Sequence, residues 1–289
     1  MKTIEKFQIQ CGKKTLDLSS RTHIMGTLNV TPDSFFDGGK YLTPELAIER
    51  GVQMAEDGAD IIDIGAESTR PGAEPISVEQ ELQRIIPVLK GLLRQIDVPI
   101  SIDTYKSFVA ETVLQIGANI INDISGLRFD PRMKEVVAKY QAPVVIMHIK
   151  GEPLNMQRNP HYDNLIREIY DYLSDSIILA VKAGIKQEKI IVDPGIGFGK
   201  RLSDNYEILR RLDEFKGLCC PILIGPSRKS FIGKVLNLPP DQRLEGTIAA
   251  VAIGIQNGAH IVRVHDVKEI SWACRIVDLL VGKTSLSVS

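Results

Sequence analysis

Eight short apolar runs, rich in β-branched residues, recur along the 289-residue chain, and each is followed by polar or glycine-rich sequence. The runs begin at Thr22, Ala59, Pro99, Asn119, Pro143, Lys189, Pro221 and Ala259. Continuous hydrophobicity over so few residues is typical of parallel strands that are covered on both faces. Segments with helical periodicity separate the runs, and several end on glycine, as helices often do. The pattern therefore predicts a repeated strand–helix unit.

Eight strands that alternate with helices predict an α/β fold, a (β/α)8 TIM barrel, at this chain length. The rival is a doubly wound open sheet, but the turn after the first run lacks the Gly-x-Gly-x-x-Gly fingerprint of that class. No linker or low-complexity segment divides the chain, so we expect one domain over residues 1–289, with the barrel over 22–282. Residues 1–21 are expected to form a short β-hairpin that closes the lower end of the barrel.

Composition narrows the functional classes. Lys and Arg number 35 against 36 Asp and Glu, so no global basic field attracts nucleic acid or an anionic membrane surface. The N-terminus has no signal-like apolar segment, and no apolar run is long enough to span a bilayer. The cysteines lack the spacing of a disulfide framework or a zinc site. We therefore expect a cytoplasmic protein with no nucleic-acid or membrane partner.

Every expected strand ends in side chains that are mostly polar, at the end where barrel enzymes place their active sites. In chain order these residues are Asn29, Glu67, Ser68, Thr69, Arg70, Asp103, Asn122, Asp123, Met147, His148, Asp193, Ser227, Arg228, Lys229, Ser230, Arg263, His265 and Asp266. Any one of them alone can be read as a helix cap, a turn residue or a structural histidine. Independent caps and turns would not fill every strand end with groups of the kind that one pocket needs.

The strand ends predict a divided site. One group is rich in hydrogen-bond acceptors and suits a flat heterocycle with several N–H donors: Asp103, Asn122 and Asp193. A second group offers cationic donors and suits a phosphate or pyrophosphate: Lys229, Arg263 and His265. The loops after the first two strands supply aromatic and hydroxyl groups that suit a second substrate.

Several familiar motifs are excluded. The stretch "GIGFGK", from Gly195 to Lys200, is one residue short of a Walker A loop and has Arg201 where a Ser or Thr would bind magnesium. No Gly-x-Ser-x-Gly elbow occurs. No His or Glu spacing predicts a zinc or di-iron centre, so any metal is expected to be Mg²⁺ held partly by substrate oxygens.

The strand-end motifs, taken together, resemble the dihydropteroate synthases, the folate-pathway enzymes that sulfonamides target. These motifs are "GTLNVTPDSFFDGG", "IDIGAESTRPGAEP", "ISIDTYK", "INDISG", "VVIMH", "IVDPGIGFGK", "GPSRKSFIG" and "VRVHDV". The match runs in order from about Ile24 to about Val267. The Asp and Asn motifs are shared with the wider pterin-binding barrels, whereas "NVTPDSF", "ESTRPG" and "SRKSFIG" together are far more specific.

The resemblance implies a (β/α)8 barrel and a transferase. Its reaction joins 6-hydroxymethyl-7,8-dihydropterin diphosphate to p-aminobenzoate, giving 7,8-dihydropteroate and pyrophosphate with magnesium present. The pterin would be bound by Asp103, Asn122, Met147, Asp193, Phe198 and Lys229. The pyrophosphate would be bound by Asn29, Arg263 and His265, and Asn29 would also hold Mg²⁺. The p-aminobenzoate site would be formed by Phe35, Thr69, Arg70, Pro71 and Ser230. Catalytic roles would fall to Asp103, Asp193, Lys229, Asp37 and Arg70.

The chemistry of that reaction fits a site without an activated nucleophile. An aniline nitrogen is already neutral at pH 7, so no strong base is required. Mg²⁺ and cations favour the departure of pyrophosphate, and the dihydropterin delocalises the positive charge left on its methylene. We therefore expect an SN1-like transfer in which Asp103 and Asp193 stabilise the cationic pterin. Lys229 is expected to face inward and Arg228 outward, because neighbours on a strand face opposite ways.

Two positions depart from the family pattern. Glu152 stands where a Thr after the glycine is common, and Phe36 is often a smaller residue in relatives. Both belong to mouth loops, so they bear on loop dynamics and inhibitor response but leave the reaction type unchanged.

Three other functions compete with this interpretation. A methyltetrahydrofolate-dependent methyltransferase domain would use the Asp and Asn set but has no need for "SRKSFIG" or for Arg263 with His265. A non-catalytic pterin carrier would bind the diphosphate without releasing pyrophosphate. A phosphosugar barrel fits poorly with an apolar-walled pocket and two central aspartates.

The last two helical segments are unusually apolar, and the second contains Trp272. One face of each can pack on the barrel, while a second apolar face predicts a subunit contact. Together with the resemblance, this pattern predicts a homodimer.

Overall fold

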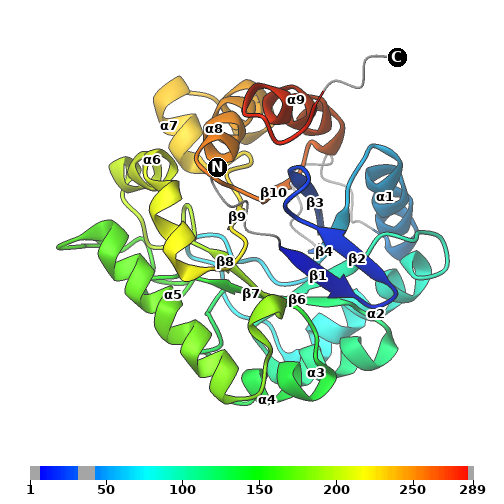
Figure 1. The fold of residues 1–289 in the computed structure, drawn as a ribbon. Coiled ribbons are helices and arrows are strands. Elements are labelled where there is room, and N and C mark those ends of the chain that lie inside the picture. The colour runs from blue at the N-terminus through cyan, green and yellow to red at the C-terminus, as the bar shows by residue number, and fades with distance from the viewer. Residues whose placement is uncertain (1–6, 32–42, 286–289) are drawn as a thin grey trace.

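The computed structural model describes residues 7–31 and 43–285 of the chain. Eight parallel strands form one sheet that curves into a barrel with helices around it (Figure 1). The strands are β3 (His23–Asn29), β4 (Ile61–Gly65), β5 (Ile100–Asp103), β6 (Ile120–Asp123), β7 (Val144–Met147), β8 (Ile190–Asp193), β9 (Leu223–Ile224) and β10 (Ile261–Val264). Their order is β8-β7-β6-β5-β4-β3-β10-β9, and a parallel bridge between Val192 and Ile222 joins the two ends. The predicted (β/α)8 barrel is confirmed.

The helices occupy the predicted segments between strands. They are α1 (Pro44–Glu56), α2 (Val78–Leu92), α3 (Ser107–Ile116), α4 (Met133–Tyr140), α5 (Leu165–Lys182), α6 (Leu202–Arg210), α7 (Ser230–Leu236), α8 (Leu244–Gln256) and α9 (Val267–Leu280), with short 3₁₀ turns at Gln187–Lys189, Leu212–Leu218 and Pro240–Gln242. One helix was not expected, because α7 lies within the motif that follows the seventh strand. Over the described residues, none of the helices combines the length and the apolar character that crossing a membrane requires.

Alternation along the strands separates an outer shell from an inner column. Residues such as Ile62 and Ile64 of β4 pack outward against the helices. Inward residues near the strand starts are apolar: Met25, Ile61, Ile120, Val145, Ile191, Leu223 and Ile261. Two residues further along five of these strands the inward positions become polar, as Thr27, Asp63, Asn122, Asp193 and Arg263. The barrel therefore has an apolar floor beneath a polar mouth.

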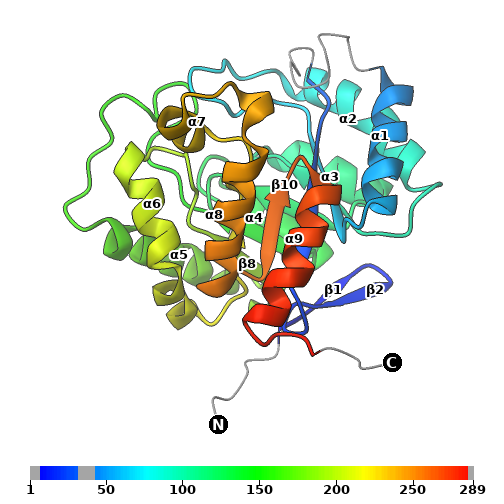
Figure 2. The ribbon, with the colours of Figure 1, turned by 90° about the horizontal axis from the view of Figure 1, so that it is seen from above.

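A β-hairpin covers that floor. The strands β1 (Gln8–Cys11) and β2 (Lys14–Asp17) pair antiparallel, with Ile9 opposite Leu16. Ile9, Cys11 and Leu18 are buried against the inward apolar residues of the barrel strands. Figure 2 shows the hairpin at the end of the barrel where β10 begins. The expected N-terminal hairpin is present, and it seals the end of the barrel opposite the strand tips.

Candidate active site

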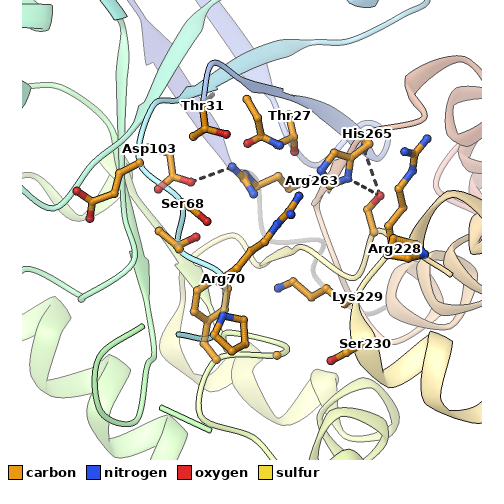
Figure 3. A pocket seen from close by; sticks show the side chains of 18 of the residues that line it. Thr27, Thr31, Ser68, Arg70, Asp103, Arg228, Lys229, Ser230, Arg263 and His265 are labelled. Atoms are coloured by element: carbon orange, nitrogen blue, oxygen red, sulfur yellow. Dashed lines mark hydrogen bonds and ion pairs between the residues drawn. The ribbon is translucent and has the colours of Figure 1, made fainter. Parts of the chain in front are cut away.

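A cavity of about 450 Å³ opens at the carboxyl ends of the strands (Figure 3). It brings together most of the predicted site residues: Asn29, Thr69, Arg70, Pro71, Asp103, Phe198, Lys229, Ser230, Arg263 and His265. Three predicted pterin residues do not line this cavity but are buried in the barrel: Asn122, Met147 and Asp193. The remaining two, Phe35 and Asp37, lie outside the described residues, as does Phe36.

Arg263 ties two carboxylates together at the barrel centre. Its Nε donates to Asp63 Oδ2 at 2.6 Å, and its Nη2 donates to Asp103 Oδ2 at 2.9 Å. The Asp63 side chain is fully buried and also accepts from Asn122 Nδ2 at 3.1 Å. The sequence analysis missed Asp63, because it considered only strand ends and this residue lies inside the apolar run of β4. An acidic residue within such a run was the available signal.

Burial raises the pKa values of two acids at the mouth of the barrel. Removal from water raises the pKa of Asp103, and the guanidinium of Arg263 opposes that rise. Burial likewise raises the pKa of Asp193, opposed by the Lys229 ammonium and by the Gly195 N–H, which donates to Asp193 Oδ1 at 2.7 Å. Asp103 is not the cap of the next helix, since α3 begins after Lys106. Both acids are therefore held inward, each opposite a cation.

Lys229 links the seventh strand end to the loop after β8. Its ammonium donates to the Ile196 carbonyl and lies 4.6 Å from the centroid of the Phe198 ring. No carboxylate of the described residues lies within ion-pair distance of it. Burial lowers the pKa of Lys229 to about 8, and the charge of Asp193 opposes the shift. The inward orientation predicted for Lys229 is what the structure shows (Figure 3).

The structure pairs Arg228 with the start of α9. Its Nε donates to Asp266 Oδ2 at 2.9 Å, so its side chain is directed toward that helix. Arg228 is also among the residues that line the cavity, and its φ of 56° lies in the left-handed region. Asp266, expected to cap a helix, makes no side-chain capping bond to α9 and pairs with Arg228 instead.

The charge assigned to His265 is also corrected. Burial, followed by the charge of Arg263, lowers the pKa of His265 to about 3, so the ring is neutral at pH 7. Ser227 Oγ accepts from the His265 backbone N–H at 3.2 Å and lies 3.0 Å from His265 Nδ1. We assign the Ser227 hydroxyl proton to the bond with Nδ1 and the ring proton of His265 to Nε2. His265 is a neutral donor, not a cation.

A buried lysine supports the wall that carries Phe198. Lys200 Nζ lies 2.9 Å from His148 Nδ1 and donates to the carbonyls of Gly195 and Phe198 at 2.9 and 2.8 Å. A Cβ at Gly195 would lie 1.9 Å from the His148 carbonyl oxygen, so the close contact between the two loops needs a glycine. His148 is thus a structural residue. Lys200 was missed, because "GIGFGK" was considered only as a nucleotide-binding motif.

Comparison with known proteins places this fold and site in a family. A model described as "Pterin binding enzyme" matches residues 25–265. The chain belongs to this pterin-binding family of barrel enzymes and, within it, to the dihydropteroate synthases, which are transferases. The predicted family is confirmed.

Two relatives define that branch. The dihydropteroate synthase of Bacillus subtilis is 47% identical over 282 residues, covering 97% of this chain and 96% of that protein. The dihydropteroate synthase of Escherichia coli K12 is 48% identical over 264 residues, covering 91% of this chain and 93% of that protein. Neither the methyltransferase nor the carrier alternative is favoured by these relatives.

Solved structures of dihydropteroate synthases have the same fold as this chain. The Yersinia pestis dihydropteroate synthase in a sulfonamide drug complex superposes with a TM-score of 0.91 at 45% identity, covering 94% of this chain and 98% of that chain. The Xanthomonas albilineans dihydropteroate synthase in complex with 7,8-dihydropteroate gives a TM-score of 0.85 at 39% identity, covering 94% and 98%.

Proposed function

We propose that the cavity of this dihydropteroate synthase holds the pterin at the barrel centre and p-aminobenzoate between the loop after β4 and the start of α7. The reaction joins 6-hydroxymethyl-7,8-dihydropterin diphosphate to p-aminobenzoate and releases pyrophosphate. The single observation that supports this arrangement is that one cavity is lined by the central acid Asp103, the cation Lys229 and the loop residues Thr69 to Pro71.

The pterin half of the proposal rests on paired polar and apolar surfaces. Asp103 and Asp193 would accept N–H groups of the pterin, and Asn122 would contribute its amide. Met147 and Phe198 belong to one apolar cluster, together with Ile124 and Met156, which suits the faces of a flat ring.

The proposed pyrophosphate site includes Nη1 of Arg263. Within the described residues, Arg263 donates to carboxylates through Nε and Nη2, and no hydrogen bond involves Nη1. We assign Nη1 and the Nε2–H of His265 to oxygens of the diphosphate, because guanidinium and N–H donors suit phosphate oxygens. Lys229 would contribute the charge that favours departure of the leaving group.

Magnesium fits the corner occupied by Asn29. This residue lines the cavity, and a Cβ built at Gly65 would lie 3.6 Å from both Asn29 Oδ1 and the Asp103 Cβ, so the glycine leaves room between the two side chains. The described residues contain no group of three His, Cys, Asp or Glu side chains that could hold a metal ion. Mg²⁺ commonly takes one protein oxygen and completes its shell with phosphate and water oxygens. Asn29 would therefore hold the ion, which would supply charge neutralisation at the leaving group.

The step itself is proposed to be SN1-like. The methylene–oxygen bond to the diphosphate breaks first, and both electrons leave with the oxygen. Asp103 and Asp193 stabilise the positive charge that remains on the pterin, and the neutral amine of p-aminobenzoate then forms the C–N bond and loses a proton. Thr69, Pro71 and Ser230 would orient the amine and exclude water from the cation.

Pyrophosphate release tests the assignment. The protein would be supplied with Mg²⁺ and the pterin diphosphate, with and without p-aminobenzoate. We expect release that depends on p-aminobenzoate and falls about 10²-fold in Lys229→Ala, because a charged donor is lost where charge develops. Lys234→Ala, an exposed lysine of α7, is the matched control and should retain activity. Saturable pterin binding without release would support the carrier alternative and overturn the proposal.

A ¹³C isotope effect on the methylene carbon tests the order of bond changes. Early departure predicts a small effect, since little bonding to the amine exists in the transition state. A large effect, as in concerted displacement, would overturn the SN1-like step but leave the overall reaction intact.

We also propose a homodimer formed through α7, α8 and α9, which lie together on one side of the barrel (Figure 1). Large apolar side chains are exposed on these helices: Val235, Leu236, Ile253, Trp272, Ile276 and Leu280. Several large apolar side chains exposed on neighbouring helices are typical of a subunit contact.

A further inference from the structure

The loop after β4 is closed at its base by one carboxylate. Glu67 precedes the loop and Ile76 ends it, and Glu67 Oε2 accepts from the Ile76 backbone N–H at 3.0 Å. The other oxygen, Glu67 Oε1, accepts from the Tyr105 hydroxyl at 2.6 Å. Both oxygens of Glu67 are thus occupied by donors of the protein. Glu67 therefore acts on the loop and is not positioned to take a proton from a substrate.

A single ammonium holds both ends of the same loop. Lys106 Nζ donates to Glu67 Oε2 at 2.5 Å and to the Ile76 carbonyl at 2.8 Å. It also donates to Glu81 Oε2, on α2, at 2.6 Å. The side chains of Lys106, Glu67 and Glu81 are only 15%, 6% and 1% exposed. Such a buried, charge-assisted contact is far less screened than a surface ion pair.

The residues assigned to p-aminobenzoate lie inside the segment that this contact closes. Thr69, Arg70 and Pro71 all line the cavity from positions 69–71, between the two anchored ends. The tip is also attached through the Gly72 N–H, which donates to the Pro153 carbonyl at 3.0 Å. Anchoring the base of a loop removes much of its conformational freedom before a ligand binds.

The anchor is also connected to the pterin side. Lys106 follows Asp103 by three residues, and Tyr105, which binds Glu67, lies between them. The strand that delivers the central acid therefore also delivers the two donors that fix the loop. The relative position of the two substrates is thus set by one short stretch of chain, 103–106.

We propose that Glu67 and Lys106 are positioning residues that hold the loop of residues 68–75 in the form that binds p-aminobenzoate. This inference rests on the proposed function, because it assumes that the loop contacts that substrate. The two side chains do not touch the reacting atoms. They act by keeping Thr69, Arg70 and Pro71 against the cavity.

The matched pair of variants is Glu67→Gln and Glu81→Gln. Both remove one carboxylate charge from the same lysine, but Glu81 lies on α2 and, among the described residues, its side chain bonds to Lys106 and not to the loop. Burial raises the pKa of Glu81, so a neutral amide is a close substitute there. In Glu67→Gln we expect the KM for p-aminobenzoate to rise at least about tenfold, as for a misplaced binding loop, with little change in KM for the pterin diphosphate. In Glu81→Gln both KM values should stay near those of the parent protein.

A second measurement does not depend on catalysis. Hydrogen exchange of the peptide containing residues 68–76, without substrates, should become faster in Glu67→Gln and remain unchanged in Glu81→Gln. Lys106→Met in the Glu67→Gln background should add little, because the two residues act through one contact. Lys106→Arg in the otherwise unchanged protein keeps the positive charge, so it should retain slow exchange of residues 68–76 and a low KM for p-aminobenzoate.

The outcomes distinguish failure of the positioning role from failure of the proposed function. Equal effects of Glu67→Gln on both KM values, or unchanged exchange of 68–76, would overturn the positioning role even if the enzyme is active. If the parent protein showed no release dependent on p-aminobenzoate, the proposed function would fail, whereas faster exchange in Glu67→Gln would still establish Glu67 as the loop anchor.

Discussion

At the scale of single residues, the buried acids at the centre of the barrel mouth lie near cations. Arg263 bridges Asp63 and Asp103, and the charge of Lys229 opposes the rise in the pKa of Asp193 without an ion pair between them. Because each charge is buried, its partner determines whether it stays ionised. This arrangement makes activity sensitive to groups that never contact a substrate.

The pH dependence of Lys229 is the first prediction. Its pKa is lowered by burial from 10.5 to about 8, so the ammonium loses its proton as the pH rises through about 8. We expect kcat/KM for the pterin diphosphate to fall above that pH, because the charge that favours pyrophosphate departure is lost. In Lys229→Arg the fall should shift to higher pH, because a guanidinium stays charged. A parent profile that remained flat up to pH 10 would contradict this role.

Deprotonation of Lys229 has the opposite effect on the free energy of unfolding. The unfolded chain binds more protons than the folded chain between about pH 8 and the ordinary value of 10.5. The contribution of Lys229 to the free energy of unfolding therefore rises with pH across this window. Lys229→Met should remove this part of the slope, measured by urea unfolding at several pH values.

The second prediction concerns Asp63. In Asp63→Asn, Arg263 loses one of its two carboxylate partners, whereas the amide oxygen can still accept from Asn122. We expect the free energy of unfolding to fall by about 3 kcal/mol, as for a broken buried ion pair, and KM for the pterin diphosphate to rise. Glu111→Gln breaks an exposed pair with Lys139 and should change neither quantity. Unchanged stability of Asp63→Asn would argue against a structural role of the pair.

Sequence patterns predicted the residues at strand ends but not those that support them. A strand end is visible as the point where an apolar run meets polar sequence, so Asp103 and Lys229 were found. Asp63, Lys106 and Lys200 act through contacts between segments far apart in the chain, and no local pattern reports such contacts.

At the scale of elements, the hairpin and the strand tips have separate tasks. The hairpin of β1 and β2 buries Ile9 in the apolar floor, whereas the loops at the other end carry the polar mouth. The strands were predictable because both their faces are covered, which gives continuous apolar runs. The helix α7 was not, because it has only seven residues and follows directly after the lysine of the site.

The third prediction tests this division. Ile9 is 1% exposed, so Ile9→Ala leaves a cavity in the floor and should lower the free energy of unfolding by about 2–5 kcal/mol. The KM values should not change, since the floor lies opposite the mouth. Thr15→Ala on β2, an exposed position, is the control. Guanidinium unfolding and steady-state kinetics on both variants provide the check, and a raised KM in folded Ile9→Ala would refute the separation.

At the scale of the whole molecule, the apolar face of α7, α8 and α9 is the main feature left uncovered. The fourth prediction is that Ile276→Glu, at a side chain that is 60% exposed, converts a dimer to a monomer in analytical ultracentrifugation. A charge placed in an apolar contact leaves an unpaired buried group on both subunits. Phe108→Glu, 56% exposed on α3, should leave the dimer intact. A parent protein that sediments as a monomer would rule out the proposed contact.

The barrel is not closed evenly. From β8 round to β10 the strands pair over several residues each, but β9 has two residues and meets β8 through the single bridge between Val192 and Ile222. The barrel therefore has one weakly paired junction, between β8 and β9, and this junction lies beside Lys229. We expect warming to weaken this junction first and to displace Lys229. Activity should therefore be lost at a lower temperature than the fold itself.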